Sequence, residues 1–228
     1  MLRGLLPLLP IALGVSVYLV GAEPPPADRR AQGEKLFNDG NYNEAYDLVR
    51  SLVLDPESQG DTLAADFSRA VACLQNLQRS HEVDAFREEA VAVHAGDWRL
   101  LARAADSLLY GEHYGFVVAG EFQRGNQRGG GEYVDSTQRD RVRALQLLMQ
   151  ARTLADQDAD KPAVSQLYSQ IVAAVSFGRE GSEAWRLQAL TDLATLPDYD
   201  EAQHWRRGWG GGSAAKGAPV DADGNPVL

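Results

Sequence analysis

The chain has 228 residues, of which 44% are apolar and 24% charged, as is ordinary for a globular protein with a buried core. Its net charge of −10 and isoelectric point near 4.9 argue against a surface that binds polyanions. Nucleic acid is therefore not an expected partner.

The N-terminal residues 1–22 have the layout of a secretory signal peptide. Arg3 precedes an apolar run from Leu5 to Val20, and two small residues follow. We predict cleavage before Glu23; the alternative is an uncleaved anchor, because roughly 18 apolar residues is the lower limit for spanning a bilayer. In both cases the rest of the chain is expected to be exported, as a periplasmic, cell-envelope or secreted protein, with membrane contact only through an uncleaved segment. Residues 23–29 are rich in proline and predict a stiff spacer.

Residues 30–206 repeat their apolar positions with a helical period and show no convincing alternating strand, which predicts an all-α domain. The stretch from Arg30 to Pro56 predicts one antiparallel helix pair. Gly33 and Ala45 are small enough for the two helices to approach closely, and Tyr42 fills space towards a neighbouring pair. In residue types and spacing this stretch resembles the tetratricopeptide repeat.

The next segments continue this pattern with less regularity. Residues 62–77 and 82–93 predict a second helix pair, and Asp97 predicts the cap of a further helix that Gly111 stops. A regular period of about 34 residues does not run through the chain. The predicted fold is therefore a set of tetratricopeptide-like helical hairpins in an irregular solenoid or a compact helical array.

The segment 116–122 is short, apolar and partly β-branched, and predicts either a helix end or a buried extended piece. A glycine-rich loop follows, after which Asp135 and Gln138 form a plausible capping box for a long helix through Asp156.

Two more helices are predicted over residues 162–177 and 182–196. Residues 207–228 are rich in glycine and predict a flexible linker that ends in the start of a β-hairpin, with a turn at Asp223 and Gly224.

No constellation in the sequence predicts an enzyme, a metal site or a bound cofactor. The four histidines lack a second ligand at helical spacing, and no Gly-x-Ser-x-Gly elbow occurs. The acidic tail around Asp221 lacks the spacing of an EF-hand loop. The single cysteine, Cys73, lies at a helix-core spacing and predicts a buried, inert thiol.

The glycine-rich loop is the first candidate for a binding site. Its arginines Arg124 and Arg128, together with backbone amides, would suit a phosphate, but the loop lacks the lysine and hydroxyl order of a P-loop. We interpret it as a plain flexible loop, and keep both arginines as candidates for partner binding.

A second candidate is the start of the long helix, where Arg139 and Arg143 lie with Arg141. Asp135 and Asp140 lie nearby in the sequence, so we interpret this stretch as a salt-bridged, solvated face. The functional alternative is a docking face for an acidic partner domain.

The tyrosines Tyr42, Tyr110 and Tyr114 complete the candidate set. They either fill space between helices or line a concave groove that takes an extended peptide, as helical repeats often do.

Taken in order, the export signal, the helix pair, the loop-and-helix segment 120–151 and the glycine-rich exit resemble the N-terminal region of large bacterial alpha-2-macroglobulin-like proteins. Proteins of that family are exported, have many domains and are implicated in trapping or inhibiting proteases. The resemblance implies that this chain is a helical leader that ends as the first β-domain begins. The family's thioester motif is Cys-x-Glu-Gln, which the residues after Cys73 do not match, so no functional residue carries over.

Two hypotheses on function follow. The first is a non-enzymatic, exported helical-repeat domain that mediates protein contacts as the leader of a macroglobulin-like protease inhibitor, with the downstream domains among its partners. The second is a stand-alone periplasmic adaptor that binds peptides or assembles an envelope complex. A periplasmic hydrolase is a third class that the missing motifs do not support.

Overall fold

The computed structural model describes residues 24–126, 129–177 and 193–201. The prediction of a mostly helical protein is confirmed. The helices are α1 (Pro26–Asn38), α2 (Tyr42–Val53), α3 (Gly60–Asn76), the 3-10 helix η1 (Ser80–Glu82), α4 (Val83–Val93), α5 (Trp98–Leu109), α6 (Thr137–Ala155) and α7 (Lys161–Ser176). The strands are β1 (Tyr114–Val118), β2 (Glu121–Arg124), β3 (Glu132–Asp135) and β4 (Asp200–Glu201).

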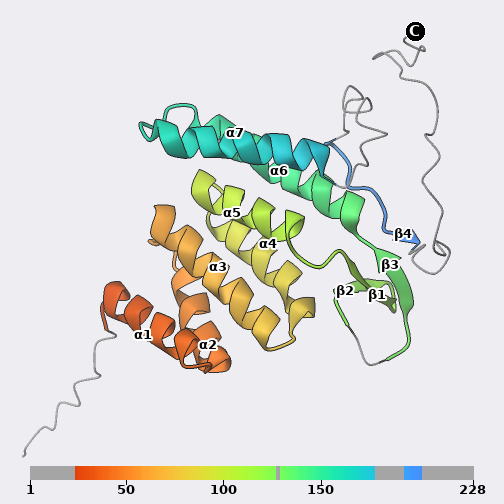
Figure 1. Ribbon diagram of the computed structural model, residues 1–228, viewed down its shortest axis with the longest axis horizontal. Helices are drawn as coiled ribbons and strands as arrows, with labels where there is room; N and C mark the ends of the chain where they lie inside the picture. The colour runs from red at the N-terminus through yellow and green to blue at the C-terminus, as the bar shows by residue number, and fades with distance from the viewer. Residues whose placement is uncertain (1–23, 127–128, 178–192, 202–228) are drawn as a thin grey trace, which may run out of the picture.

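The helices form a stack that runs from α1 at one end to α7 at the other (Figure 1). One continuous apolar core fills the space between them, and Phe67, Leu74, Leu101 and Leu148 are each fully buried in it. Each such side chain contributes roughly 1.5–3 kcal/mol by leaving water. This core, rather than helix propensity, holds the short helices in place.

The first hairpin forms as its residue types predict. Gly40, between α1 and α2, has φ +81°, a conformation that side chains disfavour. A Cβ on Gly33 would lie 2.9 Å from Cγ2 of Val49. The small residue at this position therefore lets the two helices touch.

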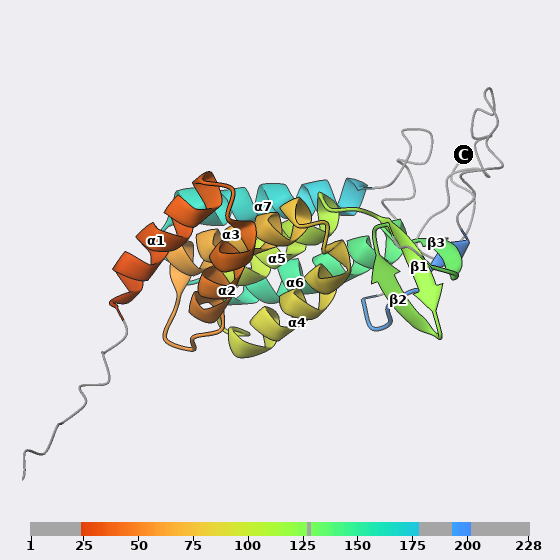
Figure 2. The same cartoon turned by 90° about the horizontal axis from the view of Figure 1, so that it is seen from below.

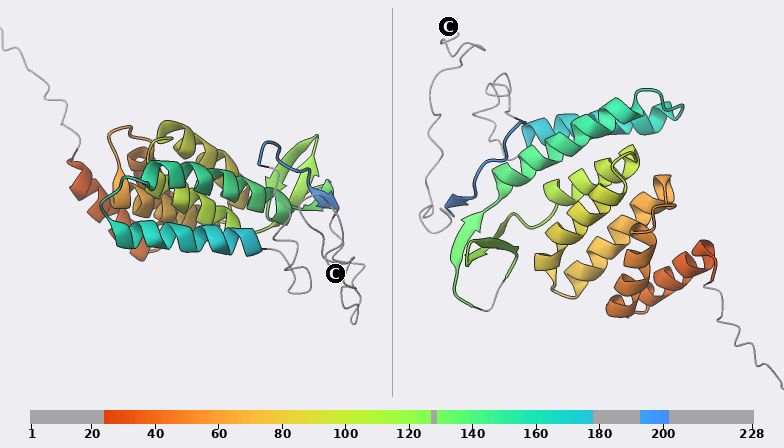
Figure 3. Two further views of the ribbon diagram at one scale, coloured as in Figure 1. Left: turned by 90° about the horizontal axis from the view of Figure 1, so that it is seen from above. Right: turned by 180° about the vertical axis from the view of Figure 1, so that it is seen from behind.

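The expectation of an all-α domain is wrong in one region. Between α5 and α6 the chain makes the antiparallel strands β1, β2 and β3, and β4, which follows α7, pairs with β3. The strand order is β2-β1-β3-β4, and the sheet lies to one side of the stack, next to the ends of α5 and α6 that it connects (Figures 1 and 3). The segment 116–122, taken in the sequence as a helix end or an extended piece, is the hairpin of β1 and β2. Its two-residue turn, Ala119 and Gly120, has positive φ at both positions, which suits the twist of a hairpin.

Some predicted boundaries also change. Pro26 begins α1, so the proline-rich spacer ends earlier than residue 29; proline fits the first turn of a helix, where its missing N–H is not needed. Asp97 caps α5 by accepting from the backbone N–H groups of Arg99 and Leu100, as predicted. The N-cap of α6 is Ser136, and the Asp135 carboxylate accepts from the Thr137 N–H, so the predicted capping box is not formed.

Other predicted segments lie outside the described residues, namely the signal segment 1–22, most of the predicted helix 182–196 and the tail 207–228. None of the helices within the described ranges is both long and apolar enough to cross a bilayer.

Candidate functional site

The first candidate region is a pocket between α3, α5 and α7, which we call the groove pocket. We call the side of the stack on which it lies the inner side. In the view of Figure 2, α1, α3 and α7 lie along one side of the molecule and α2 and α4 along the other. The pocket has a volume of about 130 Å³. Its floor is apolar and includes Ala64, Trp98, Ala102 and Leu167, all of which are buried.

The rim of the groove pocket is polar. It includes Asp61 of α3, Arg99 and Arg103 of α5, and Gln166 and Gln170 of α7. A small apolar floor inside a polar rim is the arrangement that takes one aliphatic side chain and hydrogen-bonds the chain that carries it.

Polar contacts fix the helices that form this groove pocket. The Arg99 guanidinium lies 3.0 Å from Asp61 and 2.7 Å from Asp158, and the Trp98 indole N–H donates to Asp158 at 2.8 Å. The hydrogen bond from Arg99, with those from the Asp160 N–H and Trp98, lowers the pKa of Asp158 well below its usual range. The ring of Trp98 is held by its hydrogen bond to Asp158, and the Arg99 guanidinium packs 4.3 Å above the centre of the ring.

A second link joins α5 to α7. The Gln170 amide donates to Asp106 at 2.9 Å, and Arg103 lies 3.3 Å from the same carboxylate. Burial raises the pKa of Asp106, against the effects of Arg103 and Gln170. These contacts make the groove pocket largely pre-formed, so a ligand would order few groups on binding.

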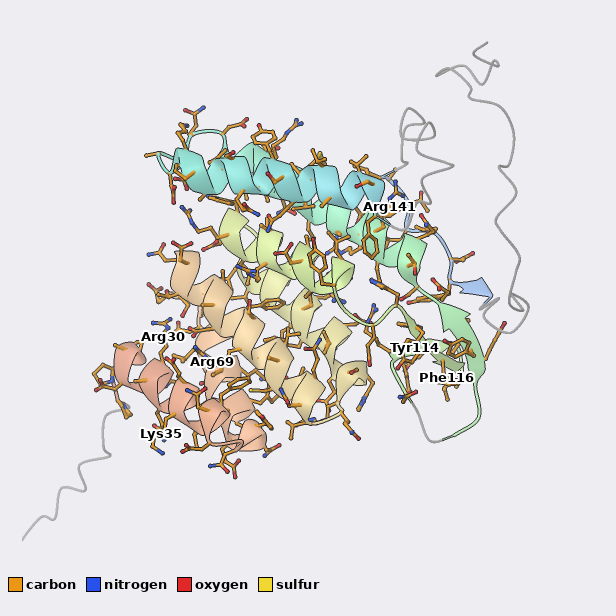
Figure 4. The ribbon with its side chains drawn as sticks, viewed as in Figure 1. Arg30, Lys35, Arg69, Tyr114, Phe116 and Arg141 are labelled. Carbon is orange, nitrogen blue, oxygen red and sulfur yellow. The ribbon has the colours of Figure 1, made fainter. Side chains whose placement is uncertain are left out.

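The inner face continues over α1 and α3 with paired charges. Arg30 lies 2.6 Å from the buried Asp66, and Arg69 lies 3.8 Å from Glu34 (Figure 4). Ion pairs between α1 and α3 therefore occupy this part of the inner side, whereas the groove pocket lies between α3, α5 and α7.

The second candidate region lies where the sheet meets the helical stack. Arg124, at the end of β2, is 7% exposed and makes two hydrogen bonds of 2.8 Å to Asp140 of α6 and two of 3.0 Å to Asp84 of α4. Ser136 donates to Asp140 at 2.7 Å, and Nδ1 of His113 lies 2.9 Å from the same carboxylate. This cluster, which we call the sheet anchor, joins three elements that are distant in sequence.

Charges in the sheet anchor stabilise one another. Burial raises the pKa of Asp140, but hydrogen bonds from His113, Arg124 and Ser136 outweigh it and lower the pKa overall. Burial likewise lowers the pKa of Arg124, and its bonds to Asp140 and Asp84 outweigh that effect and raise it. Both groups are therefore charged at neutral pH.

A pocket of about 330 Å³, which we call the arginine pocket, opens beside the sheet anchor. Four of its lining residues are arginines, and three are carboxylates from α4 and α6. The arginines are Arg87, Arg124, Arg139 and Arg143, and the carboxylates are Asp84, Glu88 and Asp140. Leu108, Leu196 and Tyr199 form its apolar wall.

The structure thus brings together three of the seven predicted partner-binding residues, Arg124, Arg139 and Arg143, in the arginine pocket. Arg124 ends a strand and is buried, so it does not belong to a flexible loop. Arg128 lies outside the described residues.

The interpretation of the Arg139–Arg143 stretch as a solvated, salt-bridged face is wrong for its centre. Asp140 and Arg141 are each 3% exposed, and Asp140 is bonded to Arg124 of β2. Arg143 does form an ion pair, with Glu88 of α4 at 2.5 Å, rather than with the acids of its own segment.

The predicted tyrosines do not gather at one place. Tyr42 packs edge-to-face on Phe37 within the first hairpin, with ring centroids 5.4 Å apart. Tyr114 lies on β1, with its hydroxyl 3.4 Å from Glu112. Tyr110, at the end of α5, is 72% exposed. None of them lines the groove pocket, whose aromatic residue is Trp98.

Cys73, His94 and His113 each have a defined environment in the structure. Cys73 is fully buried, as predicted, and burial raises the pKa of its thiol. His113 contacts Asp140, and Nε2 of His94 lies 2.7 Å from the Val53 carbonyl oxygen, so each of these two histidines has a polar partner. Within the described ranges no cluster of three metal-ligating side chains occurs.

The residues that line the groove pocket were not predicted as a site from the sequence. Ala102, Ala163 and Gln170 look like ordinary helix positions. A signal was present in the alanines on facing helices, but only the stacking order shows which of them share a pocket.

Comparisons with known proteins give little for this chain. No family model matches it, and no curated protein matches it. Among solved structures it is similar to the type III secretion translocator chaperone SycD of Yersinia enterocolitica, with a TM-score of 0.39 and 15% identity over 65% of this chain and 81% of that chain. Similarity at this level assigns neither fold nor function. The predicted relation to alpha-2-macroglobulin-like proteins stays a prediction.

Proposed function

We propose that this chain is a non-enzymatic, tetratricopeptide-like protein-binding module that holds a segment of a partner protein against the inner side of its helical stack. The observation that carries the proposal is the groove pocket between α3, α5 and α7, with its apolar floor and polar rim.

The size and the lining residues of the groove pocket determine which kind of ligand it can hold. Its volume of about 130 Å³ suits one aliphatic side chain, and its walls offer no pair of groups placed for acid–base or nucleophilic work. The rim carries both donors, such as Gln166, and acceptors, such as Asp61. An extended or helical peptide segment satisfies such a rim with its backbone and polar side chains.

The test is selection of a phage-displayed library of random linear peptides on the full chain. Peptides that bind the wild type are then measured against Ala163→Phe, which places a ring at the pocket rim. Ala92→Phe, on the exposed side of α4, adds the same ring away from the groove and is the matched control. Thermal melting of both variants verifies that they fold.

We expect selected peptides to carry a recurrent aliphatic residue and to bind Ala163→Phe about tenfold or more weakly, since a filled pocket forfeits the burial of one side chain. Ala92→Phe should bind as the wild type does. Selected peptides that bind all three proteins equally would contradict the proposal.

Two finer statements extend this proposal. We propose either that the module is a stand-alone exported adaptor in the cell envelope or that it is the leader of a macroglobulin-like inhibitor. Both rest on the sequence patterns alone. Reading the coding frame past Leu228 tests the second: continued β-rich domains support it, and an immediate stop codon contradicts it.

A further inference from the structure

We propose that the arginine pocket is a second binding site, separate from the groove pocket, that takes a carboxylate carried next to an apolar side chain on a partner polypeptide. The proposal does not depend on the proposed function of the groove.

The charge balance of the pocket is the first observation. Four arginines face three carboxylates, which leaves one positive charge in excess inside a concave, half-buried site. The whole chain carries a net charge of −10, so this pocket has the opposite sign to the molecule around it. A confined site of that kind concentrates anions.

Arg139 is the source of the excess charge. Its guanidinium donates to the Pro197 carbonyl oxygen at 2.7 Å and lies 4.7 Å above the centre of the Tyr199 ring. Arg124 is shared by Asp84 and Asp140, and Arg143 pairs with Glu88. Among the side chains that the structure describes, no carboxylate lies within ion-pair distance of Arg139.

Arg87 supplies a second, independent observation. It is 2% exposed and lines the arginine pocket from α4. Its terminal nitrogens contact Asp84 and Ser107, whereas its Nε makes no hydrogen bond. Burial lowers the pKa of this guanidinium, as expected for a cation that its surroundings compensate only in part. The Nε has almost no accessible surface, so a carboxylate in the arginine pocket would relieve that deficit through its charge and not through a direct hydrogen bond.

The apolar wall narrows the class of ligand. Tyr199 stacks on Phe122 with ring centroids 4.3 Å apart, which fixes an aromatic surface beside Arg139. Leu108 and Leu196 extend that surface. A volume of about 330 Å³ exceeds what a lone carboxylate needs and suits an acidic group together with a neighbouring aliphatic side chain.

Such a carboxylate has two sources in a polypeptide, an internal Asp or Glu side chain and the free C-terminus. Arginine recognises both through the same paired N–H···O bonds. The experiment therefore has one arm for each source, with a neutral peptide of matched shape.

The probes are four short peptides. Acetyl-Ala-Ala-Leu with a free C-terminus is paired with its C-terminal amide, and acetyl-Ala-Glu-Leu-Ala amide is paired with its Gln counterpart. Each is titrated into the full chain labelled with nitrogen-15, and the Nε–H signals of the arginines are followed by NMR. The signals of Arg87 and Arg139 are assigned by substitution.

We expect at least one carboxylate peptide to shift the Nε–H signals of Arg87 and Arg139, and its neutral partner to leave them in place. Arg139→Gln should weaken that binding about 10- to 100-fold, the worth of one charged hydrogen bond. Arg139→Lys should recover part of it. Arg152→Gln, on the exposed side of α6, is the matched control and should bind as the wild type does.

The outcome identifies the source of the carboxylate. Binding only of the free-terminus peptide assigns the site to chain ends, and binding of the Glu peptide assigns it to internal acids. Equal shifts by charged and neutral peptides, or unchanged binding by Arg139→Gln, would overturn the proposal. So would the absence of any shift with all four peptides.

Discussion

The helical stack and the inserted sheet are held by different forces. The stack buries a continuous set of apolar side chains between seven helices within the described residues. In the strands β1 to β3, only Val134 is a buried apolar side chain. The sheet is instead fixed to the stack through the buried charges of Arg124 and Asp140. The same chain thus uses area-driven packing in one region and directional polar bonds in the other.

Polar contacts can orient an inserted sheet that has little apolar packing against the helices. A sheet that buries little apolar area gains little from the hydrophobic effect and has no packing reason to choose one orientation. The sheet anchor offers only one arrangement in which Arg124 meets both Asp84 and Asp140. We infer that the anchor sets where the sheet lies, and hence the shape of the arginine pocket.

Removing a large core side chain should lower the free energy of unfolding more than any other change considered below. Phe67 is fully buried and stacks on Phe86 with ring centroids 5.5 Å apart. Phe67→Ala should lower the free energy of unfolding by about 3–5 kcal/mol through lost burial and the cavity it leaves. Urea denaturation followed by circular dichroism measures this. A loss below about 1 kcal/mol would show that the stack is not held by this core.

Breaking the sheet anchor should cause the second largest loss of unfolding free energy. Asp140→Ala leaves Arg124 buried with half of its hydrogen bonds to carboxylates, and should lower the free energy of unfolding by about 3 kcal/mol. The double variant Arg124→Met with Asp140→Leu removes both charges and should recover much of that loss. Relative to the wild type, Asp140→Ala should speed amide hydrogen exchange more in β1 to β3 than in α2 or α3. Uniformly faster exchange would argue against separate forces in the two regions.

Acid should weaken the anchor in a predictable direction. The pKa of Asp140 is lower in the folded protein than its ordinary value of about 3.9, because His113, Arg124 and Ser136 donate hydrogen bonds to it. Its contribution is therefore complete above about pH 4 and is lost as the pH falls through the folded pKa. The difference in unfolding free energy between wild type and Asp140→Asn should be constant at neutral pH and shrink in acid. A difference that grows in acid would contradict the assignment.

An exposed ion pair on the stack should have the smallest effect. Arg50 of α2 lies 2.5 Å from Glu89 of α4, and both side chains are at least 40% exposed. Glu89→Gln should change the unfolding free energy by less than about 0.5 kcal/mol, because water screens the pair. A larger loss, measured by urea denaturation, would mean that surface charges also hold the stack.

The sequence revealed the parts of this fold that depend on near neighbours. Tyr42 and the Asp97 cap contact residues at most five positions away, and Gly33 meets Val49 of the next helix, 16 residues away. The helical pattern was therefore sufficient to predict α1, α2 and α5. The sheet depends on pairing Phe116 with Tyr133 across a glycine-rich loop, and no local pattern encodes that register.

The candidate sites were predictable to a smaller extent. Arg124 and Asp140 lie 16 residues apart, and Asp84 lies 40 residues from Arg124. In a sequence such charges resemble solvated surface residues, since charged residues are seldom buried. Arg139 and Arg143 were chosen as partner-binding residues, but the pocket they share with α4 follows only from the three-dimensional arrangement.

Binding of a peptide segment in the groove pocket can be measured at Trp98, which lies on the floor of that pocket. The full chain, labelled with 5-fluorotryptophan, is titrated with a selected peptide and followed by fluorine-19 NMR, with the Trp98 signal assigned by Trp98→Phe. We predict that the Trp98 signal shifts along the same binding curve as the peptide, and that this shift is lost in Ala163→Phe but kept in Ala92→Phe. A peptide that binds while the Trp98 signal stays in place would contradict the claim.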